Sequence, residues 1–303
     1  MIEIERMKIP SGGADARAGR VVWDPVQSLW TIGWTGLGVI GAFFTVSLEA
    51  VLVFLITTAI TIGLGHSIGM HRLLIHRSFE SPRLLEYVLV WLGSMVGMAG
   101  PVGMIRTHDL RDWAQRQETC HSFFAHGVRF WRDAWRQLHC RIELDRPPRF
   151  VLEARVAEDP VYRFMERTWR WQQVALALIF FGIGGWSWVI WGVGLRVAIS
   201  LFGHFAVGHL AHNDGHQGWS VEGAAVQGYN WPIFSWITFG ESWHANHHAF
   251  PGSARLGLER GQCDPGWRLL QIMERLGLAR NIVTPERLPQ RAAVTRVDPL
   301  SKA

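Results

Sequence analysis

Three histidines near the C-terminal end of the chain have the residue type and spacing of a metal site. His244, His247 and His248 stand at positions i, i+3 and i+4 of the segment 240–251 (GESWHANHHAFP). On a helix, residues three and four apart lie on one face, so we expect the three imidazoles to converge on one small volume. Imidazole is the commonest metal ligand in proteins and suits iron, copper and zinc. The segment therefore predicts a metal site.

Further histidines precede this segment in two groups. His71 and His76 are five residues apart behind a long apolar run, and His209, His212 and His216 have helical spacing. The chain has 14 histidines but only three cysteines, which form no CxxC pair. A single zinc ion needs four ligands, so this many imidazoles without thiolates indicates two metal ions and favours iron over zinc.

The composition indicates a membrane protein with a large polar part. Hydrophobic residues make up 49% of the chain, and 17 residues are Trp. The net charge is +5, but the Lys and Arg residues concentrate beside apolar segments, where they meet lipid head groups and bias orientation. No basic patch accompanies a nucleic-acid-binding motif, so we expect membrane lipids and no nucleic acid as partners.

Apolar stretches predict four membrane spans in two hairpins, and glycines at 182–185 mark the turn of the second hairpin. The expected spans are residues 29–47, 48–68, 172–186 and 188–210. Arginines flank the first hairpin at both ends, which places those ends in the cytoplasm. The expected fold is an all-α integral membrane protein with a cytoplasmic helical cap that carries the histidines.

The domain organisation follows from these spans. The membrane domain covers residues 29–285, and its cytoplasmic cap is formed by 69–170 and 211–285. Residues 1–28 are expected to be a cytoplasmic N-terminal segment and 286–303 a flexible tail. Both termini and the metal site are then cytoplasmic.

Two histidine-bearing segments resemble the histidine boxes of the membrane-bound fatty acid desaturases. Residues 69–79 (GMHRLLIHRSF) resemble the first box, and 239–251 (FGESWHANHHAFP) resemble the third. Residues 253–257 (SARLG) and 264–267 (DPGW) resemble the bacterial members, which implies a bacterial inner membrane. The resemblance covers roughly residues 30–285, and the order of the boxes around two apolar hairpins agrees with it.

The resemblance implies an enzyme with two iron ions and no other cofactor, with molecular oxygen as co-substrate. Such an enzyme introduces a double bond into a long fatty acyl chain, on coenzyme A or on a lipid. Oxidation of an unactivated C–H bond needs a metal oxidant, which agrees with this expectation. The chain has no cluster of cysteines for an iron–sulfur centre, so electrons must come from an external donor of the ferredoxin or cytochrome type.

The resemblance also implies most of the metal ligands, and no catalytic residue beyond the metal centre. The ligands that match the family are His71, His76, His212, His244, His247 and His248. His209 and His216 share a helix face with His212 and are rival ligands or its partners. Glu241 has two alternative roles: a hydrogen bond that orients a ligand imidazole, or a helix cap.

The second box departs from the family pattern of a histidine, two residues and a histidine pair. His108 matches the first position, but Arg111 and Asp112 occupy the places of the pair. In one interpretation Asp112 is a ligand with His108, because the two are four residues apart and carboxylate with imidazole is a normal iron set. In a second, His121 and His126 replace the missing histidines. In a third, the site is degenerate and binds one metal ion or none.

The altered second box keeps other functions open. A carboxylate near the metal ions adds negative charge, which would favour hydroxylation or oxidative decarboxylation of a similar chain over desaturation. A non-catalytic membrane protein that binds metal or lipid is the second alternative.

Overall fold

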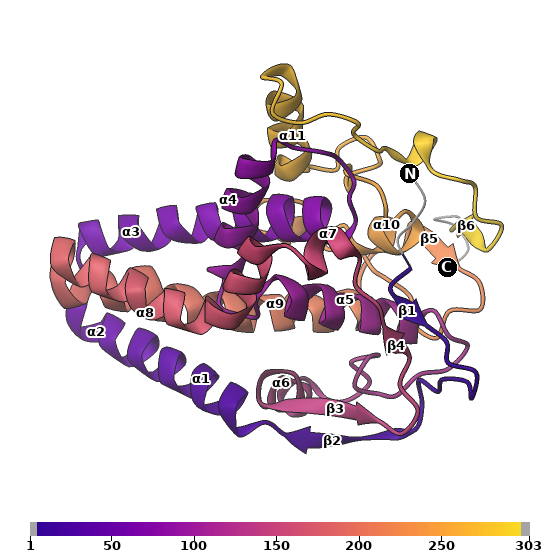
Figure 1. Cartoon of the computed structure of the whole chain (residues 1–303), viewed down its shortest axis with the longest axis horizontal. Coiled ribbons are helices and arrows are strands. Elements are labelled where there is room, and N and C mark those ends of the chain that lie inside the picture. The colour runs from indigo at the N-terminus through magenta and orange to yellow at the C-terminus, as the bar shows by residue number, and fades with distance from the viewer. Residues whose placement is uncertain (1–4, 298–303) are drawn as a thin grey trace.

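The computed structural model describes residues 5–297 and is mostly helical (Figure 1). The helices are α1 (Pro25–Thr35), η1 (Gly36–Ile40), α2 (Gly41–Thr45), α3 (Leu48–Ala59), η2 (Ile60–Ile75), α4 (Arg83–Ser94), α5 (Pro101–Gln115), α6 (Phe130–His139), α7 (Ala154–Ala157), α8 (Pro160–Val189), η3 (Ile190–Leu195), α9 (Arg196–Asn213), η4 (Pro232–Phe234), α10 (His244–Ala249), α11 (Pro265–Arg275) and η5 (Pro285–Arg287). The strands are β1 (Met7–Lys8), β2 (Gly19–Trp23), β3 (Cys140–Leu144), β4 (Arg149–Phe150), β5 (Trp219–Val221) and β6 (Val294–Arg296).

Three continuous helical segments in the described residues are long and apolar enough to cross a membrane. They are Pro25–Thr45, Leu48–Ile75 and Pro160–Asn213. Large apolar side chains on them are exposed, among them Phe43, Phe44 and Leu178, as expected for surfaces that face lipid. This confirms the expectation of a helical membrane protein. The segments extend beyond the expected spans, because the helices of 48–75 and 160–189 continue into the polar part of the chain.

The third of these segments reverses its direction. Gly185 has φ 63° and ψ −156°, a conformation that glycine adopts without steric cost. The chain turns back there, so that α8 packs against η3 and the two arms run side by side at the left of Figure 1. This bend lies within the glycine-rich stretch expected to form the turn of the second hairpin.

The helix η2 is a π-helix of 16 residues, in which backbone hydrogen bonds join residues five apart. The amide of His76 donates to the carbonyl of His71 at 3.0 Å in this way. Positions five apart therefore lie near one face, which brings His71 and His76 together, with ring centroids 4.7 Å apart. The five-residue spacing of the first box thus depends on this local geometry.

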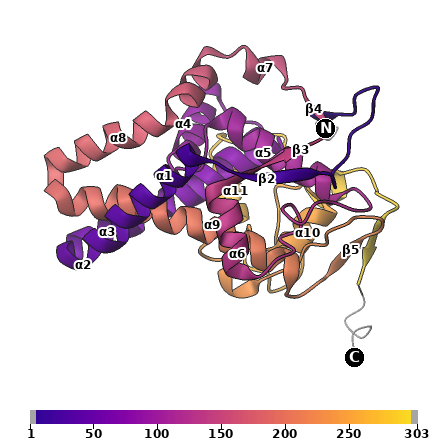
Figure 2. The same ribbon diagram turned by 90° about the horizontal axis from the view of Figure 1, so that it is seen from below.

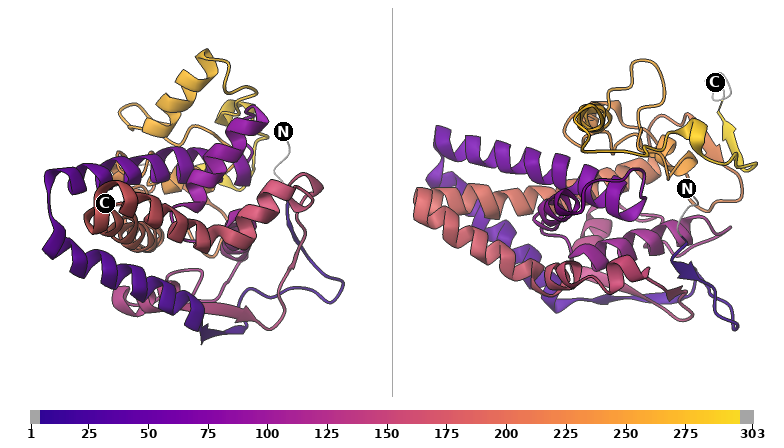
Figure 3. Two further views of the ribbon diagram at one scale, coloured as in Figure 1. Left: turned by 60° about the vertical axis from the view of Figure 1, so that its left-hand side comes forward. Right: turned by 45° about the horizontal axis from the view of Figure 1, so that its top comes forward.

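The polar segments form a cap at one end of the apolar helices, on the right of Figure 1. Three antiparallel ladders tie distant segments together, β1 with β4, β2 with β3 and β5 with β6. The helix α6 packs against α9 and the β2–β3 ladder, on the near side in Figure 2, and α11 packs on η2 at the outer edge of the cap in Figure 3.

Both ends of the described chain are joined to the cap. The buried guanidinium of Arg6 pairs with Asp109 at 2.9 Å and with Glu153 at 2.6 Å. At the other end, β6 lies within the segment expected to be a flexible tail, and it pairs with β5. The flexibility of that tail and the proposed domain boundaries stay predictions, and positions 1–4 and 298–303 lie outside the described residues.

Candidate metal centre

Four histidines from three helical regions form a first cluster. His71 and His76 come from η2 and its end, His108 from α5 and His247 from α10, and one ring nitrogen of each lies within 4.8 Å of the others. The Nε2 atom of His76 is 3.1 Å from Nε2 of His71 and 3.3 Å from Nε2 of His108. Four imidazoles at this separation form a set of the size that metal ions take.

Three further histidines form a second cluster beside it. His212 lies in the last turn of α9, and His244 and His248 lie one turn apart on α10. The Nε2 atom of His244 is 2.9 Å from that of His212 and 3.1 Å from that of His248. The three histidines of α10 thus share a helix face, but they serve two clusters rather than one small volume. His247 belongs to the first cluster, and His244 and His248 belong to the second.

The hydrogen bonds around His212 leave its Nε2 atom as an acceptor that faces the second cluster. The Nδ1 atom of His212 lies 2.6 Å from the carbonyl oxygen of Gly208, and Gln115 Nε2 lies 3.1 Å from His212 Nε2. A carbonyl accepts only from an N–H, so the proton of His212 is on Nδ1 and Nε2 carries a lone pair. Burial and the neighbouring imidazoles hold the pKa values of His76, His244 and His247 well below the ordinary value. Neutral rings with facing lone pairs fit metal ions.

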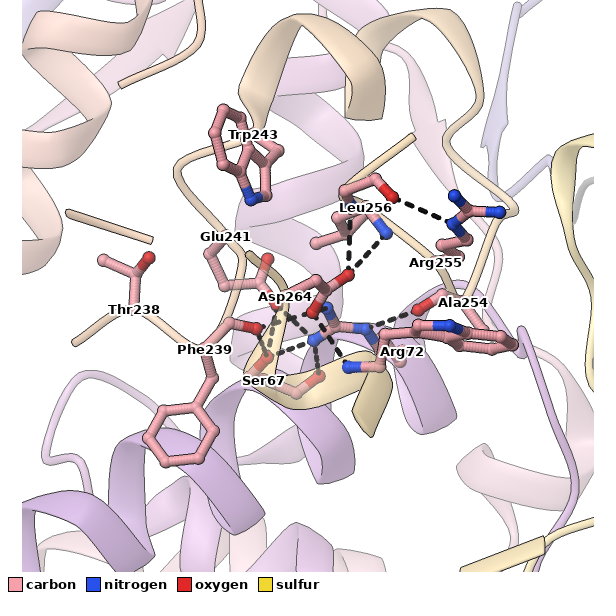
Figure 4. Close-up of polar contacts among 12 residues, drawn as sticks. Ser67, Arg72, Thr238, Phe239, Glu241, Trp243, Ala254, Arg255, Leu256 and Asp264 are labelled. Carbon is pink, nitrogen blue, oxygen red and sulfur yellow. Dashed lines mark hydrogen bonds and ion pairs between the residues drawn. The ribbon is translucent and has the colours of Figure 1, made fainter. Parts of the chain in front are cut away.

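Glu241 lies against His71. A buried arginine holds Glu241 in turn (Figure 4). Its Oε2 atom lies 2.6 Å from Nδ1 of His71, and its Oε1 atom accepts from Ser67 Oγ at 2.6 Å and from Arg72 Nη1 at 2.8 Å. Burial opposes ionisation of Glu241, but the neighbouring His71 and Arg72 outweigh it and lower the pKa of the carboxyl. A carboxylate this close to Nδ1 is placed to take up the Nδ1 proton of His71, as such partners do for metal-bound histidines.

The side chain of Arg72 joins the first box to the segment that follows the third. It is 1% exposed, and it donates to Asp264 Oδ1 at 3.0 Å and to the carbonyl of Ala254 at 2.8 Å. Figure 4 shows Arg72, Glu241 and Asp264 in one connected network. From the sequence alone, Arg72 is one of the arginines that flank the first hairpin. Its signal was an arginine directly beside a candidate ligand, which burial would oblige to find carboxylate partners.

Asp112 lies at the edge of both clusters. Its Oδ2 atom is 3.9 Å from His108 Nδ1 and 3.5 Å from Arg116 Nη2. Together with His247 and His248 it lines a small cavity. Burial raises the pKa of Asp112, but the neighbouring His108 and Arg116 lower it by a larger amount. The net shift of the pKa is therefore downward. A carboxylate in this position adds negative charge where the two groups of imidazoles meet.

The remaining candidate histidines lie outside the two clusters. His126 and His209 both contact Asp133, at 2.6 Å and 2.8 Å, in a separate buried group. His121 accepts from the backbone amide of Phe123 and lines a surface pocket with Arg132. His216 is exposed and pairs through its backbone with Asn230. Among the described residues, neither His121 nor His216 belongs to a group of three or more metal-binding side chains.

Comparisons with known proteins identify the family of the chain. The family described as fatty acid desaturase matches residues 47–261. The chain is 35% identical over 259 residues to an sn-1 stearoyl-lipid 9-desaturase of Anabaena variabilis, which covers 85% of this chain and 93% of the relative. It is 31% identical over 270 residues to a protein of the same name from Synechocystis sp., with 84% and 81% covered.

A relative of another printed name is similar over a comparable length. The chain is 30% identical over 277 residues to an acyl-CoA 5-desaturase of Anemone leveillei, with 89% of this chain and 84% of the relative covered. The match to the family extends over well over half of the chain and includes both histidine clusters. The chain therefore belongs to the fatty acid desaturase family and is an enzyme of the kind that introduces double bonds into fatty acyl chains.

Proposed function

We propose that this protein is a membrane-bound diiron desaturase, which uses molecular oxygen to introduce a double bond into a long acyl chain of a lipid or of acyl-CoA. The observation that carries the proposal is the pair of imidazole clusters, joined by α10, at the cap end of the apolar helices. The relatives bear the names of lipid and of acyl-CoA desaturases, so both head groups remain in the proposal.

The first cluster would hold one iron through His71, His76, His108 and His247. The second would hold the other through His212, His244 and His248, with Asp112 as the candidate ligand that completes the set. Imidazole with carboxylate is a normal ligand set for iron and lacks the thiolates that zinc sites often contain. Bound iron would supply, with oxygen, the oxidising power that side chains lack for an unactivated C–H bond.

The side chains of the protein orient and insulate this centre. Glu241 and the carbonyl of Gly208 hold one imidazole of each cluster in the tautomer that presents Nε2. The seven candidate histidine ligands and Asp112 all lie at partly or fully buried positions, which restricts access of water. The apolar helices extend from the clusters away from the cap, so an acyl chain can reach the centre from the lipid. Electrons would come from a separate ferredoxin- or cytochrome-type donor.

The proposed topology has four spans with both termini and the centre in the cytoplasm of a bacterium, at its inner membrane. The bend at Gly185 supports this count, since it divides the 54-residue segment into two arms, each long enough to cross. The helices that carry His71 and His212 then end on the same side as the cap. Cysteine accessibility labelling of loop positions in intact cells and in membrane vesicles would test the orientation.

A hydroxylase is the second candidate function, and Asp112 is the observation that favours it. A carboxylate at this position supplies negative charge that an imidazole would not, and it stabilises the higher oxidation state of a nearby metal ion. Fatty acid analysis of a host that expresses the protein distinguishes the two activities, because a hydroxylated chain and an unsaturated chain differ in mass.

Expression in a host that lacks the activity, followed by fatty acid analysis, tests the proposal. We expect a new unsaturated chain with the wild-type protein and with His216→Gln, a change of an exposed histidine. We expect none with His247→Gln, which removes a member of the first cluster. Purified wild-type protein should contain two irons per chain. A protein without bound iron, or a product that is not an oxidised acyl chain, would refute the proposed function.

A further inference from the structure

A guanidinium stands beside the second cluster, in the place where the second box of the family has a histidine. Arg111 lies on α5, three residues after His108, and its Nη1 atom is 2.8 Å from Nε2 of His126. Its Nη2 atom donates to Gln137 Oε1 at 2.8 Å. Arginine stays protonated, so it cannot bind a metal ion as imidazole does. Its two arms instead bind two acceptors from the segment 126–137.

The contact with Arg111 determines the tautomer of His126. Because the guanidinium can only donate, Nε2 of His126 must accept, and the ring proton of the neutral imidazole is on Nδ1. That proton points to Asp133 Oδ2, 2.6 Å away. The same oxygen of Asp133 is 2.8 Å from Nδ1 of His209 on α9. A continuous chain of contacts thus runs from Arg111 through His126 and Asp133 to His209.

This arrangement argues against a third metal ion at the group of His126, Asp133 and His209. A metal ion between Asp133 and His209 would need the lone pair of His126 Nδ1, but that nitrogen carries the proton because Nε2 accepts from the positively charged Arg111. The N–O distances of 2.6 and 2.8 Å within the group are those of charge-assisted hydrogen bonds. The group is therefore a hydrogen-bonded support, although its residue types would suit a metal.

The support reaches the second cluster through His126. The ring of His126 is stacked on the ring of His212, with centroids 5.2 Å apart and an interplanar angle of 8°. The backbone carbonyl of His126 accepts from Asn213 Nδ2 at 3.2 Å, next to His212 in the chain. Arg111 and Asp133 therefore hold His126, and His126 in turn contacts His212, the one imidazole that α9 contributes to the second cluster.

We propose that Arg111 is a positioning residue of the second metal site: by locking His126 and its partners in place, it holds the ring of His212 with Nε2 toward His244. The proposal rests on the diiron centre proposed above. Arg111, which occupies a histidine position of the second box, then supports the metal site and does not bind the metal ion. The cluster near Arg111 would then bind its iron with three imidazoles and Asp112, while the other cluster has four imidazoles.

Iron binding and Mössbauer spectra of ⁵⁷Fe-loaded protein test the proposal without recourse to activity. We expect Arg111→Gln to weaken iron binding at the second site roughly 10- to 100-fold, as loss of a partner of a metal ligand does, and to alter the signal of one iron only. Arg111→Lys should retain part of the affinity, because an ammonium can donate to His126 but lacks the planar fork. Arg132→Gln, an exposed arginine next to Asp133, is the matched control.

A second variant separates positioning from general stability. His126→Phe keeps an aromatic ring against His212 but removes both nitrogens, so it breaks the contacts with Arg111 and Asp133. We expect it to alter the same iron signal, and the double variant with Arg111→Gln should be no worse than the poorer single one, since both act through one path. His126→Phe also decides the question if Arg111→Gln does not fold.

The outcomes distinguish this inference from the proposed function. Wild-type protein without iron refutes the diiron centre itself. Wild-type protein with two irons, together with unchanged affinity and spectra in Arg111→Gln or His126→Phe, overturns the role of Arg111 and leaves the centre intact. A third metal ion per wild-type chain that is lost in Asp133→Asn would overturn the inference in favour of a metal site at that group.

Discussion

The Nδ1 atom of His71 lies 2.6 Å from a carboxylate oxygen of Glu241. The other oxygen of the same carboxylate accepts from Arg72 Nη1 at 2.8 Å. One residue of the third box therefore orients a histidine of the first box, and a fully buried arginine keeps that residue charged. The hydrogen bond between Arg72 and Glu241 joins residues that are 169 positions apart in the sequence.

Removal of the Glu241 charge should weaken iron binding at the first cluster. In Glu241→Gln the side chain keeps its size but loses the strong acceptor for His71, so we expect a roughly 10- to 100-fold loss of iron affinity. Chelator competition measures the change, with Glu274→Gln, an exposed glutamate of α11, as the control. Wild-type affinity in Glu241→Gln would show that His71 needs no carboxylate partner.

Asp112 variants should reveal whether this carboxylate is a ligand. We expect Asp112→Asn to lower the iron content and to raise the reduction potential of the centre, because it removes a negative charge beside both clusters. Asp112→His should restore iron content, since imidazole is also an iron ligand. Redox titration and iron analysis measure both effects, with Asp145→Asn at an exposed position as the control. Full iron content and activity in Asp112→Ala would exclude Asp112 as a ligand.

The contact of η2 with α4 should be intolerant of added volume. A Cβ atom at Gly69 would overlap the backbone of Leu89, so Gly69→Ala must displace the helix that carries His71 and His76. We expect a loss of about 1–3 kcal/mol in stability together with reduced iron content. Gly33→Ala in α1 meets no atom within 4 Å and should change stability by at most about 1 kcal/mol, in the favourable direction. Thermal midpoints in detergent compare the two, and equal midpoints would contradict the close approach.

The metal-free protein should lose stability as the pH falls from neutral. Burial lowers the pKa of His126 and of His248 to about 4, from an ordinary value of 6.5. The unfolded chain therefore binds protons at these groups before the folded chain does. Their contribution to stability is complete above pH 6.5 and is lost as the pH falls toward about 4. Thermal midpoints between these limits measure the slope, which should be shallower in His126→Phe; an unchanged slope would show that His126 does not contribute.

The sequence by itself determined the class of the protein and most of the candidate ligands. Long apolar runs require helices in a bilayer, because every backbone polar group must be satisfied within the segment. The helical spacing of His244, His247 and His248 predicted a shared face, and they lie on α10. Short-range periodicity carries this information, since it depends only on residues a few positions apart.

The tertiary structure decided how the histidines are divided and what supports them. Their partition into groups of four and three, the π-helical alignment of His71 with His76, and the contacts of Arg72 and Arg111 were not evident from spacing. Each depends on segments far apart in the chain, or on a helix type that the residue pattern does not distinguish. Side chains such as Arg111 acquire their role only when packing excludes water and leaves a single set of partners within reach.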